Sequence, residues 1–226
     1  MTLVEWKLEA RALSRRKADG TWLIRDASVL VRPGDRIGVH GESGAGKTVF
    51  LRALAALDPL ESGSLWWSGE EITGAAFPRY RSRAVYLHQR PALMEGSVEQ
   101  NLALPFELRV HHGKRFDRER AAALLESLGK PASFLTKAHG ELSGGEAQIT
   151  SLVRALLIEP AVILLDEPTA SLDAKSATTV ERALRAWLDE APTQRALVCV
   201  SHDLAFMGTL TERRLRMHGG TLTEDA

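Results

Sequence analysis

Residues 41–48 of this chain read Gly41-Glu42-Ser43-Gly44-Ala45-Gly46-Lys47-Thr48. Residues 36–39 before them read as a short strand, and apolar side chains recur at helical spacing over residues 49–57, until Pro59. Glycines between a strand and a helix let successive backbone N–H groups point into one concavity, which suits a triphosphate. The stretch therefore predicts a P-loop in an α/β fold. Lys47 would then reach the β- and γ-phosphates, and the Thr48 hydroxyl would ligate Mg²⁺. We expect residues 41–48 and the following Val49 to form the nucleotide-binding site.

A second motif is the apolar run at residues 162–165, which ends in two adjacent carboxylates, Asp166 and Glu167. If the strand continues through both residues, their side chains point in alternate directions and can do different work. Asp166 is then placed to hold the Mg²⁺ shell, and Glu167 to orient or deprotonate the water that attacks the γ-phosphorus. A solvated acidic pair before Pro168 is the alternative, which the P-loop upstream disfavours.

A third motif, Leu142-Ser143-Gly144-Gly145-Glu146, opens a predicted helix. Ser143 followed three residues later by Glu146 is a capping box, which explains the motif as local structure. The paired glycines are not needed for capping, and each costs about 1 kcal/mol in a helix. Glycines at a helix N-terminus allow phosphate to approach closely, so the motif indicates a second anion site. Two phosphate sites for one nucleotide imply two chains.

These motifs, in this order, resemble those of ABC transporter nucleotide-binding subunits, and the resemblance spans essentially the whole chain. It implies an ATPase that uses ATP and Mg²⁺, energises a separate membrane permease, and forms a head-to-tail homodimer when ATP is bound. Ser143, Gly144 and Gly145 would then act in trans on ATP held by the partner's P-loop, with Glu146 beside them. The implied fold is a P-loop NTPase core of ABC ATPase type, with an N-terminal antiparallel β subdomain and a helical insert.

The same resemblance assigns three further residues. Gln89 matches the glutamine that links Mg²⁺ and water to the helical insert, although a surface glutamine after a strand is the plain alternative. Asp173, in Ser171-Leu172-Asp173, matches a loop that crosses the dimer interface, and it also reads as a helix cap. His202 matches the histidine that contacts the γ-phosphate, whereas a lone histidine after a strand is usually structural.

The resemblance also implies the organisation and the partners of the chain. We expect one ABC ATPase domain over residues 1–226, in which residues 1–89 and 141–226 form the core with its β subdomain and residues 90–140 form the helical subdomain. An integral-membrane permease would hold the chain at the cytoplasmic face of the inner membrane, with no nucleic acid bound and no membrane insertion of its own. The FetA-like putative iron exporter group is closest in pattern, which suggests a metal ion as cargo.

Departures from the family pattern concern the third motif and the nucleotide base. Glu146 stands where glutamine is usual, and Ile149 stands where arginine is common. The family usually stacks adenine on an aromatic residue upstream of the P-loop, and three residues near that place remain open as substitutes: Arg16, Lys17 and Trp22.

The remaining sequence reads as an α/β protein with a helical stretch in its middle. We expect strands at residues 29–31, 161–165 and 196–200, a helix at 174–188 between the last two, and helices at 98–110 and 118–128. The adjacent histidines His111 and His112 read as a solvated helix end, since they diverge by about 100° on a helix and could not readily share a metal ion. Trp66-Trp67 reads as a strand edge or its packing, and the tail after Gly219 as frayed.

Composition narrows the classes of protein that remain. The 226 residues include 29 basic and 29 acidic side chains, so no global field recruits nucleic acid or anionic lipid. The single cysteine excludes an intrachain disulfide and indicates a reducing compartment. No run of 18 apolar residues occurs, and residues 1–5 do not resemble a secretory signal, so a membrane role would come through a partner.

Three rival functions are weighed against the motifs. A GTPase would need an Asn-Lys-x-Asp motif to read the base, but Leu102 follows the only asparagine, Asn101. A small-molecule kinase has no use for a second glycine-rich anion site. A non-transport ABC-type ATPase acting on nucleic acid or ribosomes is the better rival, although such proteins usually add long coiled coils or a second cassette.

Overall fold

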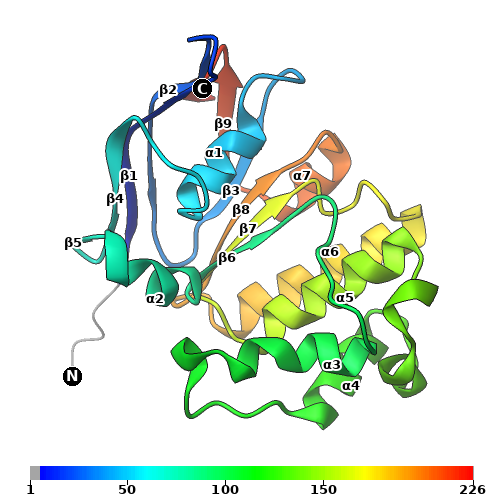
Figure 1. Ribbon diagram of the computed structural model, residues 1–226. Coiled ribbons are helices and arrows are strands. Elements are labelled where there is room, and N and C mark those ends of the chain that lie inside the picture. The colour runs from blue at the N-terminus through cyan, green and yellow to red at the C-terminus, as the bar shows by residue number, and fades with distance from the viewer. Residues whose placement is uncertain (1–5, 226) are drawn as a thin grey trace.

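The computed structural model describes residues 6–225, so the secretory signal predicted to be absent at residues 1–5 lies outside the described residues. A six-stranded sheet lies at the centre of the molecule, in the order β10-β9-β3-β8-β7-β6 (Figure 1). The five strands from β9 to β6 run parallel, and β10 is antiparallel to β9. These strands are β3 (Arg36–His40), β6 (Ala84–Leu87), β7 (Val162–Asp166), β8 (Ala196–Val200), β9 (Arg213–His218) and β10 (Thr221–Glu224).

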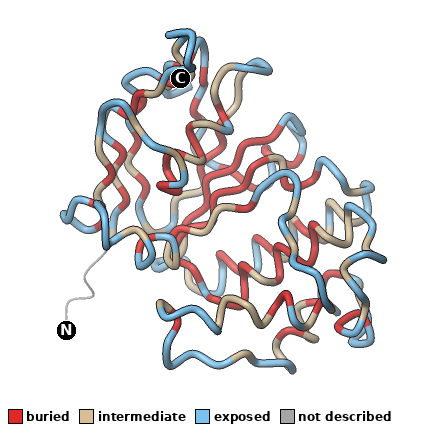
Figure 2. Tube along the Cα trace, in the orientation of Figure 1, coloured by how far each residue is buried: buried red, intermediate tan, exposed pale blue. Residues whose placement is uncertain are grey.

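Both faces of this sheet are covered, and each face packs on its own hydrophobic cluster (Figure 2). Val162 and Leu164 of β7 pack in the cluster that includes helix α1 (Lys47–Leu54). Ile163 and Leu165 pack in the other cluster, with helices α5 (Gly144–Leu157) and α6 (Ala174–Glu190). Strands buried on both faces read as continuous apolar runs, and the strands predicted at 161–165 and 196–200 are confirmed as β7 and β8.

A second sheet is antiparallel, with the order β2-β1-β4-β5. It consists of β1 (Leu8–Arg16), β2 (Trp22–Val31), β4 (Ser62–Trp67) and β5 (Glu70–Glu71). The strand predicted at residues 29–31 is the end of the longer β2, which pairs with β1. Trp67 of β4 is buried and stacks on Trp6, with ring centroids 4.9 Å apart, so the packing interpretation is confirmed for Trp67; Trp66 is half-buried.

Between β6 and α5 the chain forms α3 (Val98–Ala103), α4 (Arg118–Ser127) and four short 3₁₀ helices. The helix predicted at residues 98–110 is wrong beyond Ala103. Pro105 has no N–H to continue the helix, and the chain tightens into 3₁₀ turns over Leu104–Glu107 and Arg109–His111. His111 is buried rather than solvated, whereas His112 is exposed. The division at residues 90 and 140 stays a prediction.

The chain ends in a hairpin. The short helices α2 (Phe77–Arg81) and α7 (Leu204–Leu210) complete the fold, and β9 and β10 follow α7. The prediction of a frayed tail after Gly219 is wrong, because residues 221–224 pair with β9 and the Arg25 N–H donates to the Gly220 carbonyl at 2.8 Å. None of the helices within residues 6–225 has the length and apolar character needed to cross a bilayer.

Candidate functional site

The loop from Gly41 to Gly46 connects β3 to α1 in a conformation that needs glycine at two positions. Gly41 has φ +146° and Gly46 has φ +104°, a range that side chains rarely adopt. A Cβ at Gly41 would collide with the Met217 carbonyl oxygen, and one at Gly46 with the Leu23 carbonyl oxygen. The C-terminal hairpin and β2 therefore press against the back of the loop and hold its shape.

The front of this loop presents free hydrogen-bond donors. Within residues 6–225, no hydrogen bond uses the backbone N–H groups of Gly44, Gly46, Lys47 or Thr48. The Lys47 Nζ donates to the carbonyls of Gly41, at 2.7 Å, and Glu42, at 2.8 Å. Burial lowers the pKa of Lys47, and the nearby carboxylates of Glu167 and Asp166 oppose that shift. Free N–H groups around a cation at a helix N-terminus form an anion-binding concavity.

Asp166 ends β7 with its carboxylate held from two sides. Thr48 Oγ1 donates to Asp166 Oδ1 at 3.0 Å, and the Tyr86 hydroxyl donates to Asp166 Oδ2 at 2.7 Å. Asp166 is only 2% exposed, and burial together with this hydrogen bond raises the pKa of Tyr86. Tyr86 belongs to none of the motifs in the sequence. The available signal was its position three residues before Gln89, on a strand next to β7.

Glu167 does not continue the strand. Its φ is +49°, in the left-handed region, which turns its side chain away from the alternation of β7. Glu167 Oε2 accepts from Ser201 Oγ at 3.4 Å and from the His202 backbone N–H at 3.2 Å. Glu167 Oε1 is buried without a hydrogen-bond partner among the described residues, and it lies 3.5 Å from His202 Nε2. A buried carboxylate oxygen with a free lone pair is suited to accept a proton.

One cavity of about 760 Å³ gathers most of these groups. Its lining includes six residues of the site predicted around the loop: Ser43, Gly44, Gly46, Lys47, Thr48 and Val49. Gln89, Glu167 and His202 line it as well. Gly41 and Glu42 border a neighbouring cavity that His202 shares. Ala45 lines neither cavity, and its carbonyl accepts from the Gly220 N–H.

Thr48 and Gln89 line this cavity, whereas Asp166 does not line it and reaches it only through its hydrogen bond with Thr48. The donor atoms of these three residues fit Mg²⁺. Thr48, Asp166 and Gln89 offer hydroxyl, carboxylate and amide oxygens, which are the hard ligands that Mg²⁺ prefers. The described residues contain no group of three or more His, Cys, Asp or Glu side chains that could hold a metal unaided. An ion bound here would therefore also use nucleotide phosphates and water, as is usual for Mg²⁺.

The glycine-rich start of α5 does not reach this cavity. Ser143, Gly144, Gly145 and Glu146 are absent from its lining. The two glycines lie instead against the loop that follows Glu167, since a Cβ at Gly145 would come within 3.1 Å of the Ser171 carbonyl oxygen. Asp173 is exposed and caps α6 by accepting from the Ser176 N–H at 2.7 Å, as its local interpretation predicts.

The residues considered for the nucleotide base separate into two groups. Lys17 lines the cavity together with Leu23. Arg16 and Trp22 stack on each other instead, with the guanidinium carbon 3.7 Å from the ring centroid, and neither lines the cavity.

Comparisons with known proteins agree with this arrangement. A family model described as ABC transporter matches residues 24–170. The chain is 35% identical over 202 residues to the lipoprotein-releasing system ATP-binding protein LolD of Pseudomonas syringae pv. tomato, with 86% of each chain covered. It is 38% identical over 178 residues to ABC transporter I family member 17 of Arabidopsis thaliana, covering 78% of this chain and 66% of that one.

A solved structure confirms the predicted fold class. The chain is similar to the dimeric structure of a post-hydrolysis state of the ATP-binding cassette MJ0796 bound to ADP and Pi, with a TM-score of 0.85. The likeness covers 96% of this chain and 97% of that one at 21% identity. The P-loop lies beside an acidic strand end, the fold is that of an ABC ATPase, and the relatives are ABC transporter proteins. The chain therefore belongs to the ABC transporter family of ATP-binding proteins, which are ATPases that bind ATP together with Mg²⁺.

Proposed function

We propose that the chain is the ATP-binding and ATP-hydrolysing subunit of an ABC transporter and works as a head-to-tail dimer. One observation carries this proposal: the start of α5 lies outside the cavity of its own P-loop, yet it is built like a phosphate site. Within residues 6–225, no hydrogen bond uses the backbone N–H groups of Gly144 or Gly145. Free N–H groups at a helix N-terminus favour an anion, and in a dimer that anion is the triphosphate bound on the second copy.

The residues of the cavity divide the work in this proposal. Lys47 and the free N–H groups of the P-loop would bind the β- and γ-phosphates, while Thr48 and Gln89, with Asp166 behind Thr48, would hold Mg²⁺. When bound, Mg²⁺ offsets the negative charge that develops on the phosphate oxygens. Glu167 Oε1 accepts a proton from the attacking water, and His202, 3.5 Å from that oxygen, contacts the γ-phosphate.

Asp173 and the neighbouring Ser171 extend this arrangement to the dimer interface. The loop from Glu167 to Asp173 touches the P-loop cavity at Thr169 and Ala170 and the start of α5 at Ser171. One short segment thus connects the phosphate site of one copy with the surface that would meet the other. ATP favours the closed dimer through γ-phosphate contacts with Ser143 and its glycines, and hydrolysis removes those contacts.

A permease partner is expected to dock on residues 90–108 and the groove beside them. A largely apolar cavity of about 600 Å³ lies between the 3₁₀ turns and the core, with Leu108, Val85 and Ala155 in its lining. Three arginines, Arg81, Arg109 and Arg154, also border it. This lining fits a short amphipathic helix that carries an acidic residue. Arg109→Glu should abolish copurification of an integral membrane protein, and unchanged copurification with coupled ATPase activity would show that the placement is wrong.

The cargo is left unassigned in this proposal. The relatives are named for lipoprotein release, anion import and aliphatic sulfonate import, so their names do not converge on one substrate. None of these names supports the metal-ion cargo or the iron exporter group expected from the sequence. Through its permease, the subunit would sit at the cytoplasmic face of the membrane.

The decisive test of the dimer is the mass in solution of Glu167→Gln with and without ATP and Mg²⁺. Loss of the proposed base should trap two nucleotides between two chains, so the mass should double. Ser143→Arg in the same background should abolish the doubling by filling the start of α5, whereas Arg118→Met at the exposed start of α4 should leave it unchanged. A Glu167→Gln protein that stays monomeric with ATP contradicts the proposal.

The alternative of a non-transport ABC-type ATPase makes a different prediction. Such a protein should copurify with nucleic acid or ribosomes rather than with a membrane protein. Nuclease treatment of the purified chain, followed by ultraviolet absorbance and mass analysis, separates the two outcomes.

A further inference from the structure

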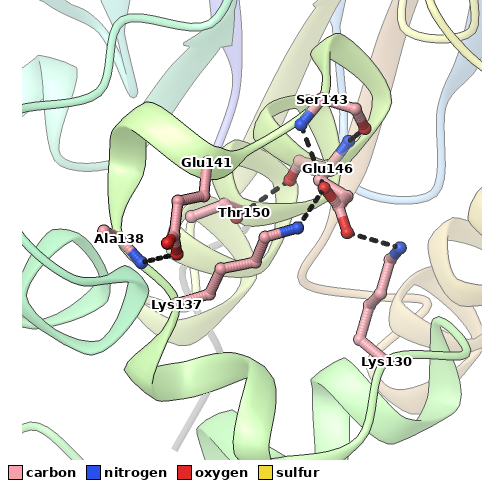
Figure 3. Close-up of polar contacts among 7 residues, drawn as sticks. All are labelled: Lys130, Lys137, Ala138, Glu141, Ser143, Glu146 and Thr150. Atoms are coloured by element: carbon pink, nitrogen blue, oxygen red, sulfur yellow. Dashed lines mark hydrogen bonds and ion pairs between the residues drawn. The ribbon is translucent and has the colours of Figure 1, made fainter.

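The glutamate at the start of α5 is held by two lysines (Figure 3). Lys137 Nζ donates to Glu146 Oε2 at 2.7 Å, and Lys130 Nζ donates to Glu146 Oε1 at 3.3 Å. The Ser143 N–H also donates to Glu146 Oε2, at 2.9 Å, and completes the capping box with the Glu146 N–H on Ser143 Oγ. Both carboxylate oxygens are therefore engaged, and these contacts, chiefly that with Lys137, lower the pKa of Glu146 to about 2.

Both lysines come from the segment that leads from α4 to α5. Lys130 follows the end of α4, and Lys137 ends the 3₁₀ helix Ala132–Thr136. Their ammonium groups lie 5.4 and 5.8 Å from the ring centroid of the buried Phe134, which is within the range of cation–π attraction. The Lys137 carbonyl accepts from the Val98 N–H at 2.9 Å, which ties the segment to the start of α3.

The charges at this helix start decide whether it attracts or repels phosphate. The N-terminus of a helix carries roughly half a positive charge. A lone glutamate in the first turn more than cancels it, which suits helix stability but opposes the approach of a triphosphate. With Lys130 and Lys137 on the carboxylate, the cluster carries a net charge of +1 in addition to the helix dipole.

We propose that Lys130 and Lys137 are positioning residues for the composite ATP site. They hold the Glu146 carboxylate in its capping geometry and neutralise its charge, so that the free N–H groups of Gly144 and Gly145 face the partner's triphosphate in a positive field. The proposal rests on the proposed function, since it needs a second copy to bring the triphosphate to α5. The lysines act through Glu146, because the one hydrogen bond that each ammonium group makes among the described residues is to a Glu146 oxygen.

This role differs from direct phosphate binding in one measurable way. If the lysines serve to offset Glu146, they become dispensable once residue 146 is neutral. Glu146→Gln keeps a side-chain oxygen that can accept from the Ser143 N–H, so the cap survives while the charge is lost. Lysines that contacted phosphate themselves would be needed equally in both backgrounds.

The experiment measures the dissociation constant of the ATP-bound dimer by analytical ultracentrifugation, in the Glu167→Gln background with Mg²⁺. Lys130→Met with Lys137→Met should weaken the dimer by about tenfold or more, since an uncompensated carboxylate then faces the triphosphate. When Glu146→Gln is also present, the two lysine substitutions should change the dissociation constant of the dimer by less than about threefold. The tenfold loss should also shrink as salt is raised, because salt screens this repulsion.

Two further variants test whether a weaker dimer results from misfolding rather than from the lost charges. Lys130→Arg with Lys137→Arg keeps both charges and should dimerise like the Glu167→Gln protein. Lys137→Met alone should show part of the loss and the same rescue by Glu146→Gln. Binding of ATP to the monomer should not change in any of these variants, because the lysines lie outside the P-loop cavity.

The possible results distinguish a failure of the proposed role of the lysines from a failure of the proposed function. The role of the lysines is overturned if the two lysine substitutions weaken the dimer equally with Glu146 and with Gln at that position, or do not weaken it at all. The composite site is not contradicted by either result. If the Glu167→Gln protein itself binds ATP but never dimerises, the proposed function fails, and the role of the lysines falls with it.

Discussion

The hydroxyl of Tyr86 is the most testable contact that the structure adds to the site. It donates to Asp166 Oδ2 at 2.7 Å from the neighbouring strand, while Thr48 engages Oδ1 at 3.0 Å. Asp166 is 2% exposed, so water cannot readily replace a lost donor. Tyr86→Phe removes the hydroxyl alone and keeps the ring, which lines the apolar groove beside the 3₁₀ turns and not the P-loop cavity.

The magnitude follows from the kind of bond. A hydrogen bond to a charged, buried acceptor contributes about 2 kcal/mol to the free energy of unfolding. For a domain of this size that loss lowers Tm by roughly 4–8 °C. A carboxylate that has lost its orienting donor also binds its metal less well, and such changes typically weaken metal binding by about 10- to 100-fold.

Two assays measure these effects. Thermal unfolding followed by circular dichroism gives the loss of stability without nucleotide, and ATPase rate against Mg²⁺ concentration at saturating ATP gives the metal dependence. Tyr80 is the only other tyrosine and offers a matched control. Its hydroxyl donates to the Leu54 carbonyl, away from the cavity, so Tyr80→Phe should lower Tm without shifting the Mg²⁺ dependence.

The reasoning is refuted by a specific result. If Tyr86→Phe shifts the Mg²⁺ half-saturation no more than Tyr80→Phe does, then Tyr86 stabilises the strand and does not orient Asp166. A Tm equal to that of the unmodified protein would show that Asp166 does not depend on the hydroxyl at all.

Three further predictions concern the loop, the α5 cap and the buried thiol. Gly41→Ala should unfold at a much lower urea concentration than Gly44→Ala, because both positions have a positive φ but, of the two, a Cβ collides with another backbone atom at Gly41 alone; equal midpoints would contradict this. The pKa of Glu146 is about 2 in the folded chain, against an ordinary value of 4.5. The contribution of its ionised carboxylate to stability is therefore complete above pH 4.5 and is lost as the pH falls toward 2. The difference in the free energy of urea unfolding between the unmodified protein and Glu146→Gln should disappear over that range. Burial raises the pKa of the Cys199 thiol, so a thiol reagent should label it only in urea, and rapid labelling of the native protein would be inconsistent with the core described here.

Several elements could be predicted because local chemistry dictates them. The P-loop requires glycine where φ is positive, and Ser143 with Glu146 forms the capping box expected from their spacing. The strands at β7 and β8 were predictable from their apolar runs. The helix predicted through residue 110 ends at Ala103 because Pro105 breaks the helical hydrogen bonding despite the apolar periodicity. The C-terminal residues form a strand because they pair with β9, and a four-residue segment does not by itself indicate such a partner.

What the sequence determined by itself is the set of local motifs and the family to which they belong, since a loop, a cap or a buried strand is specified by residues close together in the chain. Only the tertiary structure decided which distant groups meet: Tyr86 with Asp166, the lysines with Glu146, and Ser201 and His202 with Glu167. The physical reason is that these contacts depend on sheet register and on the packing of the insert against α5. Both are set by the whole core, and a shift of one residue in register would break the pairing at Asp166.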